Sequence, residues 1–82
     1  MTDSDKGSAY TPRFRRIIAD AEATARLMGH SYIGVEHLFL AILRDSDAVP
    51  TQALSDLIEP SRVASHLEAL MQSPSYLGTD DD

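Results

Sequence analysis

The sequence contains no cysteine, no tryptophan and only five aromatic residues of the Phe and Tyr types in 82 residues. Without cysteine the chain can form neither disulfide bonds nor thiolate metal sites. No apolar run approaches the ~20 residues of a membrane-spanning helix, and the first residues lack a signal-peptide pattern, so we expect a cytoplasmic protein. A chain of this length buries only roughly 60 to 65% of its unfolded surface. We therefore expect a second copy to supplement the core.

Positive charge is also scarce: seven Lys and Arg face 13 Asp and Glu, for a formal net charge of −6. This balance argues against general affinity for nucleic acid or an anionic membrane. A P-loop of the form GxxxxGK[ST] is missing, and no nucleophile motif or paired acidic site is visible. The three histidines, His30, His37 and His66, do not have the spacing of metal ligands. We expect no catalytic residues, no cofactor and no metal.

The most apolar stretch of the chain is Leu38–Leu43, six apolar residues in a row after Glu36 and His37. Its Leu, Ala and Phe content favours a helix over a strand. A helix that is apolar on every side is expected to be buried on every side, so residues 35–44 are predicted to form the central helix. Glu36 would lie in its first turn, where the helix dipole favours a negative charge.

An amphipathic helix is predicted before this one. Thr11 and Pro12 form a helix start, and Gly29 forms a helix end. The apolar stripe between them consists of Phe14, Ile17, Ile18, Ala21, Ala25 and Met28.

Two further helices are predicted after the central one. The third has Pro50 in its first turn, and the fourth ends near Gln72. Their expected buried faces are Ala53, Leu54, Leu57 and Ile58 in the third helix, and Val63, Leu67, Leu70 and Met71 in the fourth. The predicted fold is all-α, a compact unit of four short helices at residues 10–72. Residues 1–9 are predicted to be a disordered lead, and residues 73–82 a flexible acidic tail.

Two motifs resemble a known family. Thr11-Pro12-Arg13-Phe14 opens a helix, and Gly29-His30-Ser31-Tyr32-Ile33-Gly34-Val35-Glu36-His37-Leu38 follows it. Together they resemble the Clp repeat, the four-helix unit that occurs twice in the N-terminal domain of the Clp unfoldase ATPases. The resemblance covers residues 10 to about 72 and implies the same fold. Three departures stand out: Val35 replaces the usual Thr, Leu57-Ile58-Glu59-Pro60 replaces a Leu-Gly turn, and the sequence holds one repeat with no ATPase module.

The resemblance implies a recognition function. Clp N-terminal domains bind adaptor and substrate proteins, and some members bind arginine-phosphorylated proteins or cyclic-peptide antibiotics. In the members that bind phosphoarginine, the Glu of the Glu-His pair meets the guanidinium group, and Glu36 matches that position. The implied ligand-binding residues are Tyr10, Thr11, Arg15, Ile18, Val35 and Glu36.

A single repeat would expose the face on which two repeats normally pack, so we expect a homodimer that imitates the tandem domain. The expected role is that of a decoy, a regulator or an accessory factor of the Clp protease system. The alternative function is a nucleic-acid-associated regulator that uses the Arg13–Arg16 face.

Several of these residues also have a purely structural interpretation. Glu36 can simply complement the helix dipole, and His37 can be a packed, hydrogen-bonded histidine. The arginines of residues 13–16 can form a solvated helix face, and Tyr10 can belong to a linker. The sequence alone leaves these alternatives open.

Overall fold

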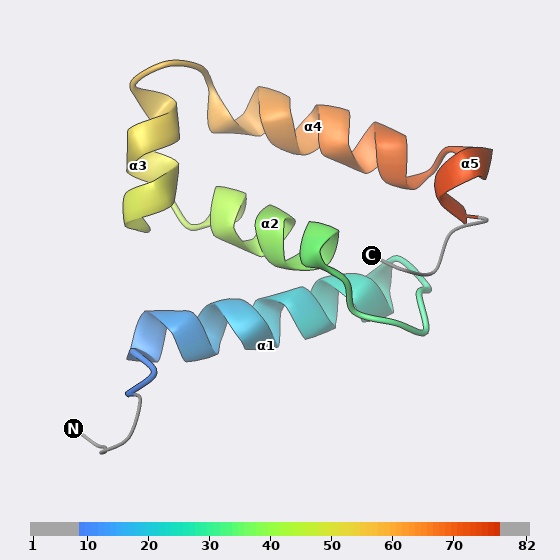
Figure 1. Cartoon of the computed structure of the whole chain (residues 1–82), viewed down its shortest axis with the longest axis horizontal. Helices are drawn as coiled ribbons and strands as arrows, with labels where there is room; N and C mark the ends of the chain where they lie inside the picture. The colour runs from blue at the N-terminus through green and yellow to red at the C-terminus, as the bar shows by residue number, and fades with distance from the viewer. Residues whose placement is uncertain (1–8, 78–82) are drawn as a thin grey trace.

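The computed structural model describes residues 9–77, which form five α-helices and no strand (Figure 1). The all-α prediction is confirmed. The expected number of four helices is one too few, because a short fifth helix lies in the segment predicted to be a tail. The predicted lead, apart from residue 9, and residues 78–82 of the predicted tail fall outside the described residues. The helices are α1 (Pro12–Leu27), α2 (Val35–Arg44), α3 (Val49–Ser55), α4 (Pro60–Met71) and α5 (Pro74–Leu77).

Local sequence signals explain both ends of α1. The Thr11 side chain accepts a hydrogen bond from the Phe14 backbone N–H at 3.1 Å, and Pro12 follows at the first helical position. At the other end Gly29 has a φ of +77°, the left-handed conformation that ends many helices. The predicted start and end of this helix are therefore confirmed.

Helix α2 lies at the centre of the molecule and packs against α1, α3 and α4 (Figure 1). Arg44, in its last turn, joins the two long neighbours: its guanidinium donates to Thr24 of α1 at 3.2 Å and to Glu68 of α4 at 2.6 Å. The central position predicted for residues 35–44 is confirmed.

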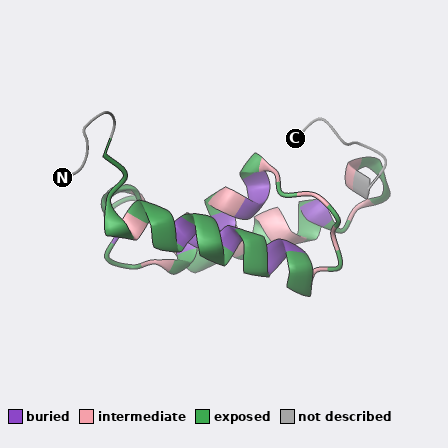
Figure 2. Ribbon diagram, turned by 90° about the horizontal axis from the view of Figure 1, so that it is seen from below, coloured by how far each residue is buried: buried purple, intermediate pink, exposed green. Residues whose placement is uncertain are grey.

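Burial of α2 is nevertheless one-sided, contrary to the prediction. Leu40 is fully buried and Ala41 nearly so, but Val35 is 68% exposed and Phe39 is 43% exposed. Helices α1 and α4 cover only part of its circumference, and this small chain has too few elements to cover the rest. Seen from the side of α1, the ribbon likewise shows short buried segments that alternate with exposed ones along that helix (Figure 2).

The predicted buried face of the third helix is wrong. Helix α3 ends at Ser55, so Leu57 and Ile58 lie beyond it, and they are 86% and 42% exposed. The buried residue of α3 is Thr51, whose hydroxyl donates to the Ile42 backbone carbonyl. In α4, Met71 is buried as predicted whereas Leu70 is about half exposed.

Candidate functional site

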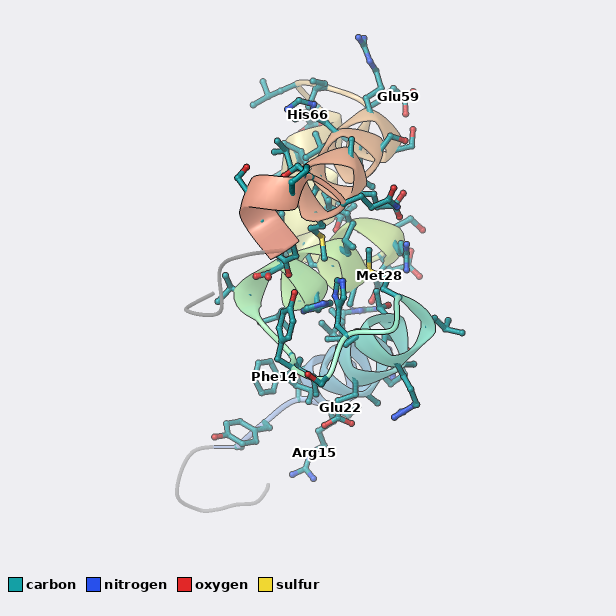
Figure 3. All side chains as sticks on the ribbon, turned by 90° about the vertical axis from the view of Figure 1, so that its right-hand side faces the viewer. Phe14, Arg15, Glu22, Met28, Glu59 and His66 are labelled. Atoms are coloured by element: carbon teal, nitrogen blue, oxygen red, sulfur yellow. The ribbon has the colours of Figure 1, made fainter. Side chains whose placement is uncertain are left out.

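A groove of about 410 Å³ lies at the N-terminal end of α1 and is lined by Tyr10, Phe14, Arg15 and Ile18. The rings of Tyr10 and Phe14 are 5.0 Å apart, and the Arg15 Nε donates to the Tyr10 carbonyl at 3.4 Å. These contacts hold Tyr10 against the helix. The groove therefore has an aromatic wall with a cation at its edge. Figure 3 shows Arg15 projecting from α1 away from α4, and Phe14 to one side of α1.

A second groove, of about 290 Å³, continues this surface toward α2. Ile18 lines both grooves, and Ile33 and Val35 line the second one. Five of the apolar residues that line the two grooves are at least 36% exposed. We call these residues the α1–α2 patch: Tyr10, Phe14, Ile18, Ile33 and Val35.

The structure thus brings four of the six predicted site residues onto one surface. Tyr10, Ile18 and Val35 belong to the α1–α2 patch, and Arg15 lies at its edge. Thr11 instead lines another groove, of about 530 Å³, between α1, α2 and α3, which adjoins the first groove at Phe14, and its hydroxyl is already used as the helix cap.

Glu36 also lies outside the α1–α2 patch, although with Val35 it lines a neighbouring groove of about 440 Å³. It is only 6% exposed, and the hydroxyl of Tyr76 donates a hydrogen bond to its Oε2. Its other oxygen, Oε1, is buried and has no hydrogen-bond partner among the described residues. A buried carboxylate oxygen without a donor is costly, because the water it has lost is not replaced. The Tyr76 hydroxyl therefore pairs with one of the two carboxylate oxygens and leaves the other unpaired.

Two hydrogen-bonded histidines, His30 and His37, lie at the start of α2. His37 is fully buried and its Nδ1 accepts from the Gly34 N–H at 2.8 Å, which caps the helix. Since Nδ1 is the acceptor, we assign the ring proton to Nε2, which donates to the His30 Nδ1 at 2.7 Å. Burial lowers the pKa of His37, nearby Glu36 opposes this effect, and His30 adds to it. These contacts support the structural interpretation of His37.

The basic face at residues 13–16 is partly neutralised. Arg13 pairs with Asp45 at 3.0 Å, whereas Arg15 and Arg16 are exposed. Although desolvation acts to raise the pKa of Asp45, the Asp47 N–H and then Arg13 lower it below its ordinary value. The described part of the chain contains no group of three or more side chains that could hold a metal ion. Residues 9–77 also include no helix long and apolar enough to cross a membrane.

The sequence pattern does not reveal the position of two residues of this region. It predicts Phe14 in the buried stripe, yet Phe14 is 42% exposed and lies in the α1–α2 patch. It predicts a tail around Tyr76, although Ser73 and Pro74 before it repeat the pattern of Thr11 and Pro12. The Ser73 hydroxyl indeed accepts from the Tyr76 N–H at 3.3 Å. The same start signal that predicted α1 was therefore present for α5.

Comparison with known proteins identifies the family. The family model described as Clp repeat (R) N-terminal domain matches residues 1–57. The chaperone protein ClpC of Pisum sativum chloroplasts is 36% identical over 59 residues, 71% of this chain. The negative regulator of genetic competence ClpC/MecB of Bacillus subtilis is 40% identical over 48 residues, 58% of this chain.

The chaperone protein ClpB of Oceanobacillus iheyensis is 38% identical, also over 48 residues and 58% of this chain. The matched region spans about 6% of the length of each of these three relatives. No solved structure gives a significant match.

Proposed function

This chain belongs to the Clp repeat N-terminal domain family, and on that premise we propose that it is a non-catalytic binding module of the Clp protease system. The observation that carries the proposal is the α1–α2 patch, where exposed apolar side chains meet around two connected grooves. Contiguous exposed apolar surface with a polar edge is typical of protein interaction sites. Aromatic and arginine side chains are also enriched at the centres of such sites.

The proposed ligands are adaptor or substrate proteins, with arginine-phosphorylated proteins and cyclic-peptide antibiotics as two specific classes. An apolar segment of a partner would fill the grooves, and Arg15 at their edge would pair with an acidic or phosphate group. Glu36 would accept the paired N–H groups of a guanidinium. Because Tyr76 now bonds to Glu36, the α1–α2 patch supports the proposal more directly than Glu36 does.

We propose further that two copies associate through their exposed apolar surfaces, in imitation of a tandem domain. Such a dimer would act as a decoy, a regulator or an accessory factor that binds Clp partners in the cytoplasm without unfolding them. Sedimentation of the purified chain at micromolar concentration tests the dimer. A folded chain that sediments as a monomer at this concentration contradicts it.

Calorimetric titration with free phosphoarginine and with a cyclic-peptide ligand of Clp N-terminal domains tests the binding function. Ile18→Asp should abolish binding of the cyclic peptide, because it places a charge between the two grooves. The matched control is Leu57→Asp, the same kind of change at an exposed residue that lines neither groove. Equal loss of binding in both variants, or binding that survives Ile18→Asp, would contradict the assignment of the α1–α2 patch.

The alternative function, a nucleic-acid-associated regulator, has less support. It needs a basic face, but Arg13 is paired with Asp45 and the chain has a net charge of −6. It requires binding to duplex DNA or RNA that weakens as the salt concentration rises.

A further inference from the structure

Helix α5 brings Tyr76 to the carboxylate of Glu36, a residue that is only 6% exposed. Among the described residues, the Tyr76 hydroxyl is the hydrogen-bond donor to the Glu36 side chain. It bonds to Oε2 and not to Oε1. Oε1 stays buried and unpaired. The arrangement therefore leaves half of the acceptor capacity of Glu36 unused, at a cost in free energy.

Aromatic contacts hold the Tyr76 ring in place. Its centroid lies 5.9 Å from the His30 ring and 6.3 Å from the Tyr32 ring, both in the loop between α1 and α2. Burial, and then the hydrogen bond to Glu36, raise the pKa of Tyr76 well above its ordinary value of 10.0. The hydroxyl accordingly keeps its proton at neutral pH and remains a donor.

Helix α5 is a short element. It has four residues and packs against the end of α4, to which the Ser73 turn connects it. A single helical turn has almost no stability of its own, because nucleation costs more than one or two hydrogen bonds return. The position of α5 therefore depends on contacts with the rest of the chain, and those of Tyr76 join it to Glu36 and to the loop between α1 and α2.

We propose that Tyr76 is a tethered competitor for the Glu36 carboxylate, so that α5 is a lid which must open before Glu36 binds an external guanidinium. The inference rests on the proposed function, which assigns Glu36 to ligand binding. A guanidinium offers two parallel N–H donors with a positive charge, so it pairs with both carboxylate oxygens, including the one that Tyr76 leaves unpaired. Only molecules with an open lid can bind the guanidinium through Glu36. The apparent affinity for the guanidinium is therefore the affinity of the open form multiplied by the fraction of molecules in which the lid is open.

Tyr76→Phe in the full chain tests the lid, because it removes the competing hydroxyl and keeps the ring. The probes are free phosphoarginine and methylguanidinium, titrated by calorimetry into the wild-type chain and the variant. We expect binding to be about tenfold tighter in Tyr76→Phe, the order of magnitude of one lost hydrogen bond. Adding Glu36→Gln to this variant should abolish the gain, since the amide carries no charge.

Hydrogen exchange of the α5 amides gives a second measurement that needs no ligand. Faster exchange in Tyr76→Phe with tighter binding supports the lid, as does binding seen in the variant alone. Equal affinity of the wild type and Tyr76→Phe, with loss in Glu36→Gln, overturns the lid and leaves the proposed use of Glu36 intact. If hydrogen exchange shows that α5 is open and neither probe binds, Glu36 does not bind a guanidinium. That result overturns both the proposed use of Glu36 and the competition between Tyr76 and the ligand.

Discussion

Helices α1 and α2 differ from α3 and α4 in how their ends are held. Thr11 caps α1 through its side chain, and His37 bonds to the backbone N–H that precedes α2. Ala48 and Glu59, which precede α3 and α4, make no side-chain cap, and each of these helices has a proline in its first turn instead. The first pair is therefore held at its start by side-chain hydrogen bonds, whereas the second pair has a proline as its start signal.

Burial follows the same division. Four residues of α1 and five of α2 are buried, against Thr51 alone in α3 and Met71 alone in α4. The family match at residues 1–57 covers the first pair and α3 but stops before α4. The comparison teaches that α1 and α2 form the stable base of the unit, and that α4 and α5 depend on the few contacts they make with it.

The largest effect is expected from Leu40→Ala in α2. Leu40 is 0% exposed, and the substitution should lower the free energy of unfolding by about 3 kcal/mol, through lost burial and a cavity. Leu57→Ala, at an 86% exposed leucine, is the matched control and should change it by less than about 0.5 kcal/mol. Urea unfolding measures both values. If both variants lose a similar free energy of unfolding, α2 contributes no more to stability than the segment after α3.

Met71→Ala removes the one buried side chain of α4 and should cost about 2 kcal/mol, at the low end for such changes. The cost should be below that of Leu40→Ala because Met71 lies near the end of its helix, where neighbours relax more easily. Hydrogen exchange should show faster opening of α4 and α5 than of α1. Uniform opening of all helices would mean that the two regions unfold as one unit.

Capping provides a finer test of the same division. Thr11→Ala should cost about 1 kcal/mol, because it leaves the Phe14 N–H without its acceptor. Glu59→Ala at the start of α4 should have little effect on the free energy of unfolding, since Glu59 makes no side-chain cap. Thermal or urea unfolding of both variants decides the point. If both substitutions lower the free energy of unfolding by the same amount, the side-chain cap of Thr11 does not stabilise α1 more than Glu59 stabilises α4.

The smallest effect is expected from acidification. The pKa of His37 in the folded state lies below its ordinary value of 6.5, so the unfolded chain binds more protons in this range. Stability due to His37 is therefore complete above pH 6.5 and is lost as the pH falls below it. The effect should be small because nearby Glu36 offsets part of the burial cost.

His37→Gln provides the control for the pH experiment. Glutamine at the same position of a helix keeps an acceptor for the Gly34 N–H but does not titrate. The variant should be less sensitive to pH between 7.5 and 5 than the wild type. An unchanged pH dependence would assign the effect to other groups.

Much of the candidate site could be predicted because it lies along one helix. Arg15 and Ile18 meet at one groove because residues three apart share a side of the helix, and Tyr10, which precedes α1, is held there by the Phe14 ring and by Arg15. Val35 joins them since the loop after Gly29 turns α2 back along α1. Glu36 could not be placed in this way. Its environment depends on Tyr76, 40 residues away in the chain.

The sequence by itself determined the helical class, the ends of α1, and the position of α2 as the central helix. Caps, turn glycines and apolar periodicity act between residues a few positions apart, so they are readable without the fold. Only the tertiary structure decided that Leu57 and Ile58 are exposed, that Phe14 belongs to the surface, and that Glu36 lies beneath Tyr76. Burial depends on which elements meet, and 82 residues supply too few of them to cover every apolar face.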